Sequence, residues 1–272
     1  MLLYFQKIGE GPVIIILHGL YGLSDNWISI ARKLSIDHTV YLVDQRNHGR
    51  SPHHPEHTYD AMSQDLNELM VAEKIEKSII LGHSMGGKTA MVFSALFPAK
   101  VDKLIVVDIG PGGYANIDQY SPQVLAHLNI VNSMLSIDFE AFTSRVQIDN
   151  ELAKTIKDQT IRQFLMKNVH RNHDNSFAWK LNIDAISKAM PVIMGSVSME
   201  KILKGASITE FPVLFIKGEK SDYINKEQEI LIVRFFPNAI IETIRDAGHW
   251  VHSEQPEFFF NLVNSFLKKK FK

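Results

Sequence analysis

Hydrophobic positions in the first 110 residues follow two alternating patterns. Short runs of β-branched and aliphatic residues, typical of strands buried on both faces, are separated by longer stretches in which apolar residues recur at helical spacing. The predicted strands are residues 13–17, 39–44, 78–81 and 103–108. The predicted helices are residues 26–34, 59–73 and 88–97. Strands separated by helices of this length imply right-handed crossovers and a mostly parallel sheet flanked by helices.

This alternation stops after a Gly-Pro-Gly-Gly segment at residues 110–113. From about Tyr120 to Gly205 the spacing predicts several helices and no strand, with Phe and Met residues scattered among them. The earlier pattern then returns, with strands at 213–217 and 239–244, a helix at 228–236, and a last helix from Pro256 to the lysine-rich end.

The chain is therefore predicted to be one α/β core with an insertion. The core comprises residues 1–112 and 206–272, and residues 113–205 form a helical cap that is not an independent domain. The cap enters after the strand that ends at Asp108.

Composition narrows the classes of protein and partner. The 272 residues are 45% hydrophobic and 22% charged, as in an ordinary globular protein, and the net charge of −1 gives no electrostatic reason to expect nucleic acid or a membrane as partner. The absence of cysteine excludes disulfides, thiolate zinc sites and a cysteine nucleophile. Because the apolar run at 13–17 is too short for a signal segment or a membrane span, we expect a cytoplasmic protein. Its oligomeric state is not predicted.

The segment around Ser84 carries the clearest chemical signal. Gly82-His83-Ser84-Met85-Gly86 matches G-x-S-x-G and lies between a predicted strand and a predicted helix. A sharp turn there holds the serine in a strained backbone conformation, exposes its hydroxyl as a nucleophile, and leaves room for very small residues only at the two flanking glycine positions.

The same segment also matches a rival motif. Gly82 to Thr89 fits G-x-x-x-x-G-K-[ST], the phosphate-binding P-loop, with Lys88 as its lysine. The strand that ends at Asp108 resembles the magnesium-binding partner of such a loop. A P-loop nucleotide binder leaves the remaining motifs unexplained. We therefore prefer to interpret the segment as the active-site turn of a serine hydrolase, with the Ser84 hydroxyl as its nucleophile.

Two backbone amides are expected to form an oxyanion hole. His18-Gly19-Leu20 ends the first buried strand, where a hydrolase places one donor, here the Leu20 N–H. The Met85 N–H, at the start of the next helix, supplies the other. His18 and His83, which adjoin these two turns, are expected to support the site.

The general base must follow the last strand, because hydrolases with a G-x-S-x-G turn on an α/β sheet carry their catalytic residues in the chain order nucleophile, acid and base. His249 lies there, while the nearby His252 is expected to pack or to cap the last helix. Two carboxylates compete as the acid, since Asp108 ends the strand after Ser84 and Asp222 follows the next one. Spacing alone leaves these two alternatives open.

A polar loop follows the second strand and is expected to be structural. Asp44 and Arg46 have hydrogen-bonding groups that can order the surrounding turns. His53, His54 and His57 come just after it, and we interpret them as a solvated turn, with no metal site.

Together these motifs resemble the YbfF-like esterases of the α/β-hydrolase superfamily. The resemblance rests on HGLYG, DQRNHGRSPH, GHSMGGKTAM, VVDIGP, the turn at Ser221 and AGHW, and it fails only in the cap. It implies the α/β-hydrolase fold, ester hydrolysis, Asp108 as the acid, and Ser221 as a second serine beside the catalytic histidine. Asp222 departs from the family, whose members tend to carry a non-acidic residue there.

The sequence therefore predicts a serine carboxylesterase that uses Ser84, His249 and Asp108 and needs no cofactor. The apolar cap predicts a pocket for short- to medium-chain acyl esters or thioesters, a small-molecule substrate. A carbon–carbon lyase or hydrolase with the same triad, and a non-catalytic small-molecule receptor, remain alternatives.

Overall fold

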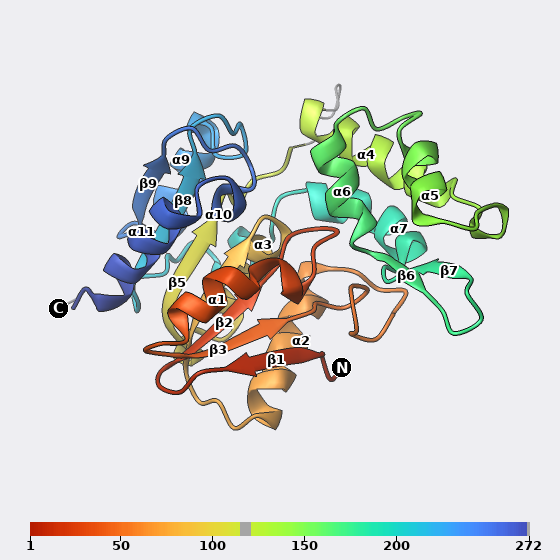
Figure 1. The fold of residues 1–272 in the computed structure, drawn as a ribbon. Coiled ribbons are helices and arrows are strands. Elements are labelled where there is room, and N and C mark those ends of the chain that lie inside the picture. The colour runs from red at the N-terminus through yellow and green to blue at the C-terminus, as the bar shows by residue number, and fades with distance from the viewer. Residues whose placement is uncertain (115–120, 271–272) are drawn as a thin grey trace.

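The computed structural model describes residues 1–114 and 121–270 and is built around one seven-stranded sheet (Figure 1). Its strand order is β1-β3-β2-β4-β5-β8-β9, and every neighbouring pair is parallel except β1 with β3. The strands are β1 (Phe5–Ile8), β2 (Val13–Leu17), β3 (Thr39–Val43), β4 (Ser78–His83), β5 (Val101–Val107), β8 (Val213–Gly218) and β9 (Ile240–Ile244). The predicted α/β-hydrolase fold, with its mostly parallel sheet, is confirmed.

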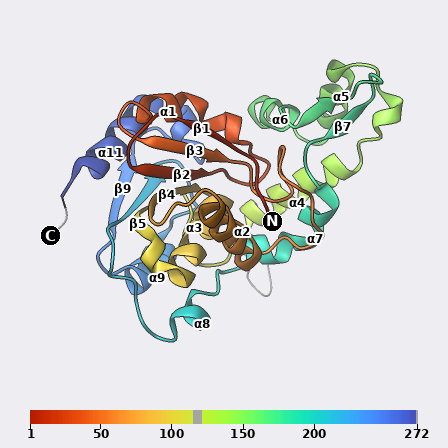
Figure 2. The same cartoon turned by 90° about the horizontal axis from the view of Figure 1, so that it is seen from below.

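Helices cover both faces of this sheet, as Figure 2 shows. Ile14 and Ile16 of β2 belong to the apolar cluster beneath α1 and α11, whereas Ile15 and Leu17 belong to the cluster on the opposite face. Successive side chains of a strand alternate between faces, so a continuous apolar run is the pattern of a strand buried on both. The helices of the core are α1 (Ile28–Leu34), α2 (Tyr59–Ala72), α3 (Met85–Leu96), α9 (Lys226–Phe235), α10 (Val251–Glu254) and α11 (Pro256–Lys268), with 3₁₀ turns at Ser24–Trp27 and Pro98–Lys100.

Most elements between β5 and β8 are helices, and all but the last of these are gathered to one side of the sheet (Figure 1). The last one lies apart from them, against α3 (Figure 2). Their apolar side chains continue the core cluster that lies beneath α2, α3 and α9. They are α4 (Pro122–Leu135), α5 (Arg145–Leu152), α6 (Gln159–Met166), α7 (Ile183–Met194) and α8 (Met199–Leu203), with a 3₁₀ turn at Phe139–Ala141. Residues 115–120 of the predicted cap and residues 271–272 of the predicted last helix lie outside the described residues. The division into core and cap stays a prediction.

Two features of the fold differ from the sequence prediction. The expectation of no strand between Tyr120 and Gly205 is wrong, because β6 (Val169–Arg171) and β7 (Phe177–Trp179) form an antiparallel hairpin there. Strand β1 was not predicted either. Strands of three or four residues are too short to show an alternation that can be told from chance.

None of the described helices combines the length and the hydropathy that crossing a membrane requires.

Candidate active site

Ser84 occupies a strained turn between β4 and α3. Its backbone has φ 52° and ψ −119°, a conformation that side-chain-bearing residues rarely adopt. A Cβ built on Gly82 would lie 2.2 Å from the Gly86 carbonyl oxygen, and one on Gly86 would lie 2.3 Å from that of Leu17. The two glycines therefore allow the close backbone approach that this turn requires.

The Ser84 hydroxyl begins a chain of three side chains from separate parts of the sequence. Ser84 Oγ lies 3.0 Å from His249 Nε2, and His249 Nδ1 lies 2.8 Å from Asp108 Oδ2. Because an ionised carboxylate only accepts hydrogen bonds, the proton of neutral His249 belongs on Nδ1. This tautomer leaves Nε2 free to accept the hydroxyl proton of Ser84.

Asp108 is fully buried and has two further donors. The Gly218 N–H donates to its Oδ1 at 2.9 Å, and the Ser221 hydroxyl donates to Oδ2. Asp222, in contrast, is exposed, and within the described part of the chain it makes no hydrogen bond or ion pair with His249. Of the two carboxylates predicted as alternatives, the structure thus brings Asp108 to the histidine.

Leu20 and Met85, the residues of the two predicted oxyanion donors, lie close to Ser84. Both residues line a cavity of about 20 Å³ together with Ser84. Met85 is the first residue of α3, and so its N–H has no carbonyl partner within the helix. The turn that contains Leu20 is closed by a hydrogen bond from Gly22 N to Gly19 O at 2.9 Å.

Two buried histidines hold this turn in place. His18 accepts the Gln45 N–H on Nε2 at 3.0 Å and donates from Nδ1 to Gly19 O at 2.8 Å. His48 accepts the Tyr21 N–H on Nε2 at 3.2 Å and donates from Nδ1 to Arg46 O at 2.9 Å. Each ring must be neutral to accept and donate in this way. Burial lowers the pKa of both His18 and His48, which favours the neutral form.

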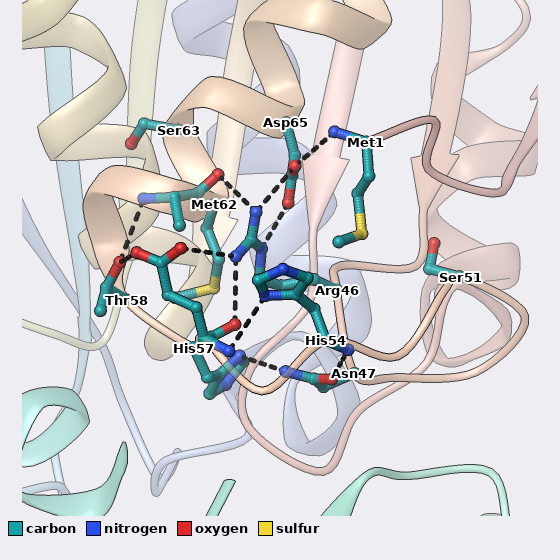
Figure 3. A network of polar contacts seen from close by, with 12 residues as sticks. Met1, Arg46, Asn47, Ser51, His54, His57, Thr58, Met62, Ser63 and Asp65 are labelled. Atoms are coloured by element: carbon teal, nitrogen blue, oxygen red, sulfur yellow. Dashed lines mark hydrogen bonds and ion pairs between the residues drawn. The ribbon is translucent and has the colours of Figure 1, made fainter. Parts of the chain in front are cut away.

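The polar loop after β3 is tied to α2 through Arg46 (Figure 3). The Arg46 guanidinium donates to both oxygens of Asp65, at 2.6 and 2.9 Å, and Asp44 accepts the backbone N–H groups of Ser24 and Arg50. His57 is buried and accepts the side-chain amide of Asn47, so its interpretation as part of a solvated turn is wrong. No set of three potential metal ligands comes together within the described residues.

Other aromatic rings pack around the catalytic candidates. His83 Nε2 donates to the His249 carbonyl at 2.9 Å, and Tyr223 stacks on the His249 ring at 4.0 Å. His252 packs as expected, stacked on Trp27 at 3.8 Å. Tyr223 was missed at the sequence level, where its nearness to Ser221 was the only available signal.

Five buried histidines make the fold sensitive to acid. Burial lowers the pKa of each below its usual 6.5, to about 4 for His57 and about 3 for His252. Between pH 6.5 and these two values the unfolded chain binds protons that the folded chain does not, so His57 and His252 each remove about 1.4 kcal/mol of stability per pH unit as the pH falls. The five residues are His18, His48, His57, His83 and His252.

We expect this proton uptake to destabilise the protein as the pH falls from 6.5 to 5, above the range in which most carboxylates are protonated. Potentiometric or calorimetric measurement of the protons taken up on unfolding at pH 5.5 should give at least three from histidine, about one each from His57, His127 and His252. His252→Phe should lower that number by about one. An uptake of one proton or none would contradict the expectation.

Lys88, the lysine of the P-loop-like motif, points into the interior. Its ammonium donates to the carbonyl oxygens of Gly112 at 2.9 Å and Gly195 at 2.5 Å, and its side chain is 1% exposed. Gly112 lies where the chain leaves the sheet, and Gly195 directly follows α7. Lys88 therefore joins the segment by which the chain leaves the sheet to the turn between α7 and α8, a position that does not suit a phosphate ligand.

Burial lowers the pKa of Lys88 to about 7, well below the usual 10.5. Between these two values the unfolded state binds more protons than the folded state, so the contribution of Lys88 to stability rises with pH. We expect the stability of wild type relative to Lys88→Met to increase by about 3 kcal/mol from pH 7 to 9.5. Urea unfolding at the two pH values measures this, and parallel curves for the two proteins would contradict it.

Comparison with known proteins agrees with this geometry. A family model described as the alpha/beta hydrolase fold matches residues 12–256. Esterase YbfF of Escherichia coli (strain K12) is 33% identical over 262 residues, covering 96% of this chain and 95% of that protein. The sn-1-specific diacylglycerol lipase ABHD11 of Danio rerio is 35% identical over 269 residues, covering 97% of this chain and 81% of that protein.

A solved structure described as a marine microorganism esterase is also similar. It shares 46% sequence identity and a TM-score of 0.91, and the match covers 97% of this chain and 99% of that one. The chain therefore belongs to the α/β-hydrolase family, in the group that includes YbfF, and it is a serine hydrolase of the carboxylic ester class.

Proposed function

We propose that Ser84 is the nucleophile, His249 the general base and Asp108 the orienting acid of an esterase that cleaves short- to medium-chain acyl esters or thioesters. The observation that carries this proposal is the unbroken chain from Ser84 Oγ through His249 to buried Asp108, at 3.0 and 2.8 Å. Both contacts are within the range that proton transfer and orientation of the imidazole require.

The proposed reaction has two stages. In the first, His249 takes the proton of Ser84 while Oγ bonds to the carbonyl carbon, and the Leu20 and Met85 N–H groups donate to the oxyanion. His249 then gives this proton to the leaving oxygen or sulfur, whose bond to carbon breaks. In the second stage, water adds to the acyl-enzyme with His249 as base, the acid departs, and Ser84 Oγ regains a proton.

The names of the relatives support an ester substrate over the alternatives. One is described as an esterase and another as a diacylglycerol lipase, and both act at an ester carbonyl by those names. A carbon–carbon hydrolase would need the same three residues, and a receptor would bind without turnover, so substrate tests separate these functions.

The test combines turnover with covalent labelling. We expect wild type to hydrolyse p-nitrophenyl esters from acetate to octanoate, and a fluorophosphonate to modify the peptide that contains Ser84 and no other. Heat-unfolded protein is the control, because its serine is not activated. Tight binding of an ester without turnover would favour a receptor, and an absence of both turnover and labelling would contradict the proposed nucleophile.

A further inference from the structure

Ser84 lines two hollows, a third adjoins one of them, and the three differ greatly in size. The first, which we call the histidine cavity, has a volume of about 50 Å³ and is lined by Ser84, His249 and Trp250, among others. The second, the inner pocket, has about 20 Å³ and is lined by Ser84, Leu20 and Met85 but not by His249.

The third hollow is a groove of about 560 Å³ between α6 and the segment of α10. It shares four lining residues with the histidine cavity, which therefore adjoins it. The shared residues are Asn26, Phe164, Trp250 and His252.

Proton transfer decides which part of a substrate occupies which hollow. His249 Nε2 must reach the leaving atom to protonate it, so the leaving group extends from Ser84 on the side of His249. That side is the histidine cavity and the groove beyond it. The acyl chain then points the other way, into the inner pocket, next to the two proposed oxyanion donors.

The inner pocket limits the acyl chain to a short one. A cavity needs about 10–15 Å³ for one water molecule, so its 20 Å³ has room for little more than one. Its walls include the side chains of Tyr59, Tyr114 and Met194. The Tyr59 hydroxyl donates to Ile193 O at 2.7 Å and that of Tyr114 to Tyr223 O at 2.8 Å, which fixes both rings. Met194 is the flexible part of the wall.

The groove, in contrast, is lined mostly by polar residues and has an aromatic side. The rings of Phe164 and Trp250 lie 5.8 Å apart along it, and Thr160, Gln163 and Ser253 add hydrogen-bonding side chains. Such a mixture of aromatic surface and polar groups is typical of sites for polar small molecules.

The charges along the groove leave one cation without a partner. Asp158 accepts the N–H groups of Thr160 and Ile161 on one oxygen, and Glu254 accepts those of Gly248 and Trp250, so both carboxylates are held by backbone amides. Lys167 makes no ion pair with any described residue. The groove therefore offers donors to an oxygen-rich ligand.

We propose that this groove is a leaving-group subsite, and that the substrate joins a short acyl group to a bulky, oxygen-rich alcohol or thiol. The proposal rests on the proposed function, since it takes Ser84 and His249 as nucleophile and base. It reverses the usual proportions of a lipid ester, in which the acyl chain is the larger part.

The test varies one side of the ester at a time. Ethyl butyrate is compared with glucose 6-butyrate, in which only the leaving group grows, and with ethyl octanoate, in which only the acyl chain grows. By titration of the released acid, we expect kcat/KM about tenfold above ethyl butyrate for the glucose ester and about tenfold below it for the octanoate.

Two variants, each with a matched control, test whether the groove sets the preference for the leaving group and the inner pocket sets the preference for the acyl chain. Thr160→Trp narrows the groove and should lower kcat/KM about tenfold more for glucose 6-butyrate than for ethyl butyrate. Thr209→Trp, at another exposed threonine outside the groove, should change neither. Met194→Ala enlarges the inner pocket and should raise the ratio of octanoate to butyrate about tenfold, whereas Met190→Ala on the same helix should not.

Three outcomes would overturn the assignment. Equal kcat/KM for ethyl and glucose butyrates would remove the leaving-group subsite. A loss of octanoate turnover in Thr160→Trp, with the glucose ester spared, would place the acyl chain in the groove. If wild type hydrolysed none of these esters and no p-nitrophenyl ester, the proposed function itself would have failed. Because Thr160 is exposed, its variant decides the question even if the methionine variants do not fold.

Discussion

Replacing Ser84 by Ala is expected to lower kcat for p-nitrophenyl butyrate by about 10⁶-fold. The substitution removes only the hydroxyl group. Its oxygen, Ser84 Oγ, lies 3.0 Å from Nε2 of His249, the base that we propose to activate it. Activity that remains should come from the oxyanion donors and from binding alone, about 10³–10⁴-fold above the reaction in water. Single-turnover kinetics with enzyme in excess would measure so slow a reaction.

The strain at Ser84 provides a control that separates catalysis from folding. Ala keeps a Cβ at φ 52°, whereas Gly adopts such conformations without cost. We expect Ser84→Gly to be about 1–2 kcal/mol more stable than Ser84→Ala, although both variants are equally inactive. A Ser84→Ala protein that is folded and keeps a tenth of the wild-type kcat would show that another group is the nucleophile.

The sheet was predictable because its buried strands are encoded locally. In β2, five consecutive apolar residues send alternate side chains into the two apolar clusters, and no helix needs such a run. Strand β1 has a mixed pattern because it is an edge strand with partly exposed side chains. The hairpin of β6 and β7 is stabilised by its surroundings, for example by Trp179 Nε1 donating to Met134 O at 3.1 Å. Such contacts have no signature in the residues themselves.

The same distinction applies to the site. The turn at Ser84 could be predicted because Gly82 and Gly86 lie within two residues of it. Lys88 shows the opposite case, since its motif matched a P-loop while its ammonium is held by two carbonyls from distant segments. The proximity of Asp108 to His249 depends on how β5, β8 and the loop after β9 meet, which spacing along the chain does not specify.

The choice between Asp108 and Asp222 yields the second large effect. Asp108→Asn is expected to lower kcat by about 10⁴-fold, because a neutral amide neither fixes the proton on His249 Nδ1 nor stabilises the imidazolium. Asp222→Asn, a matched change at an exposed carboxylate one residue from Ser221, should alter kcat less than twofold. Steady-state hydrolysis of one p-nitrophenyl ester by the three proteins gives the comparison.

A Ser221 variant tests why Asp108→Asn and Asp222→Asn should differ in kcat, and its own effect should be intermediate. Its hydroxyl donates to the Asp108 oxygen that also faces His249, while Gly218 N–H holds the other oxygen. Ser221→Ala removes one of these donors but leaves the carboxylate charged, so we expect a loss of about tenfold, far below that of Asp108→Asn. If Asp222→Asn instead lost 10³-fold or more and Asp108→Asn less than tenfold, the carboxylate that assists His249 during turnover would be Asp222. The loop after β8 would then have to move Asp222 from solvent to the imidazole, displacing Tyr223, which covers one face of that ring.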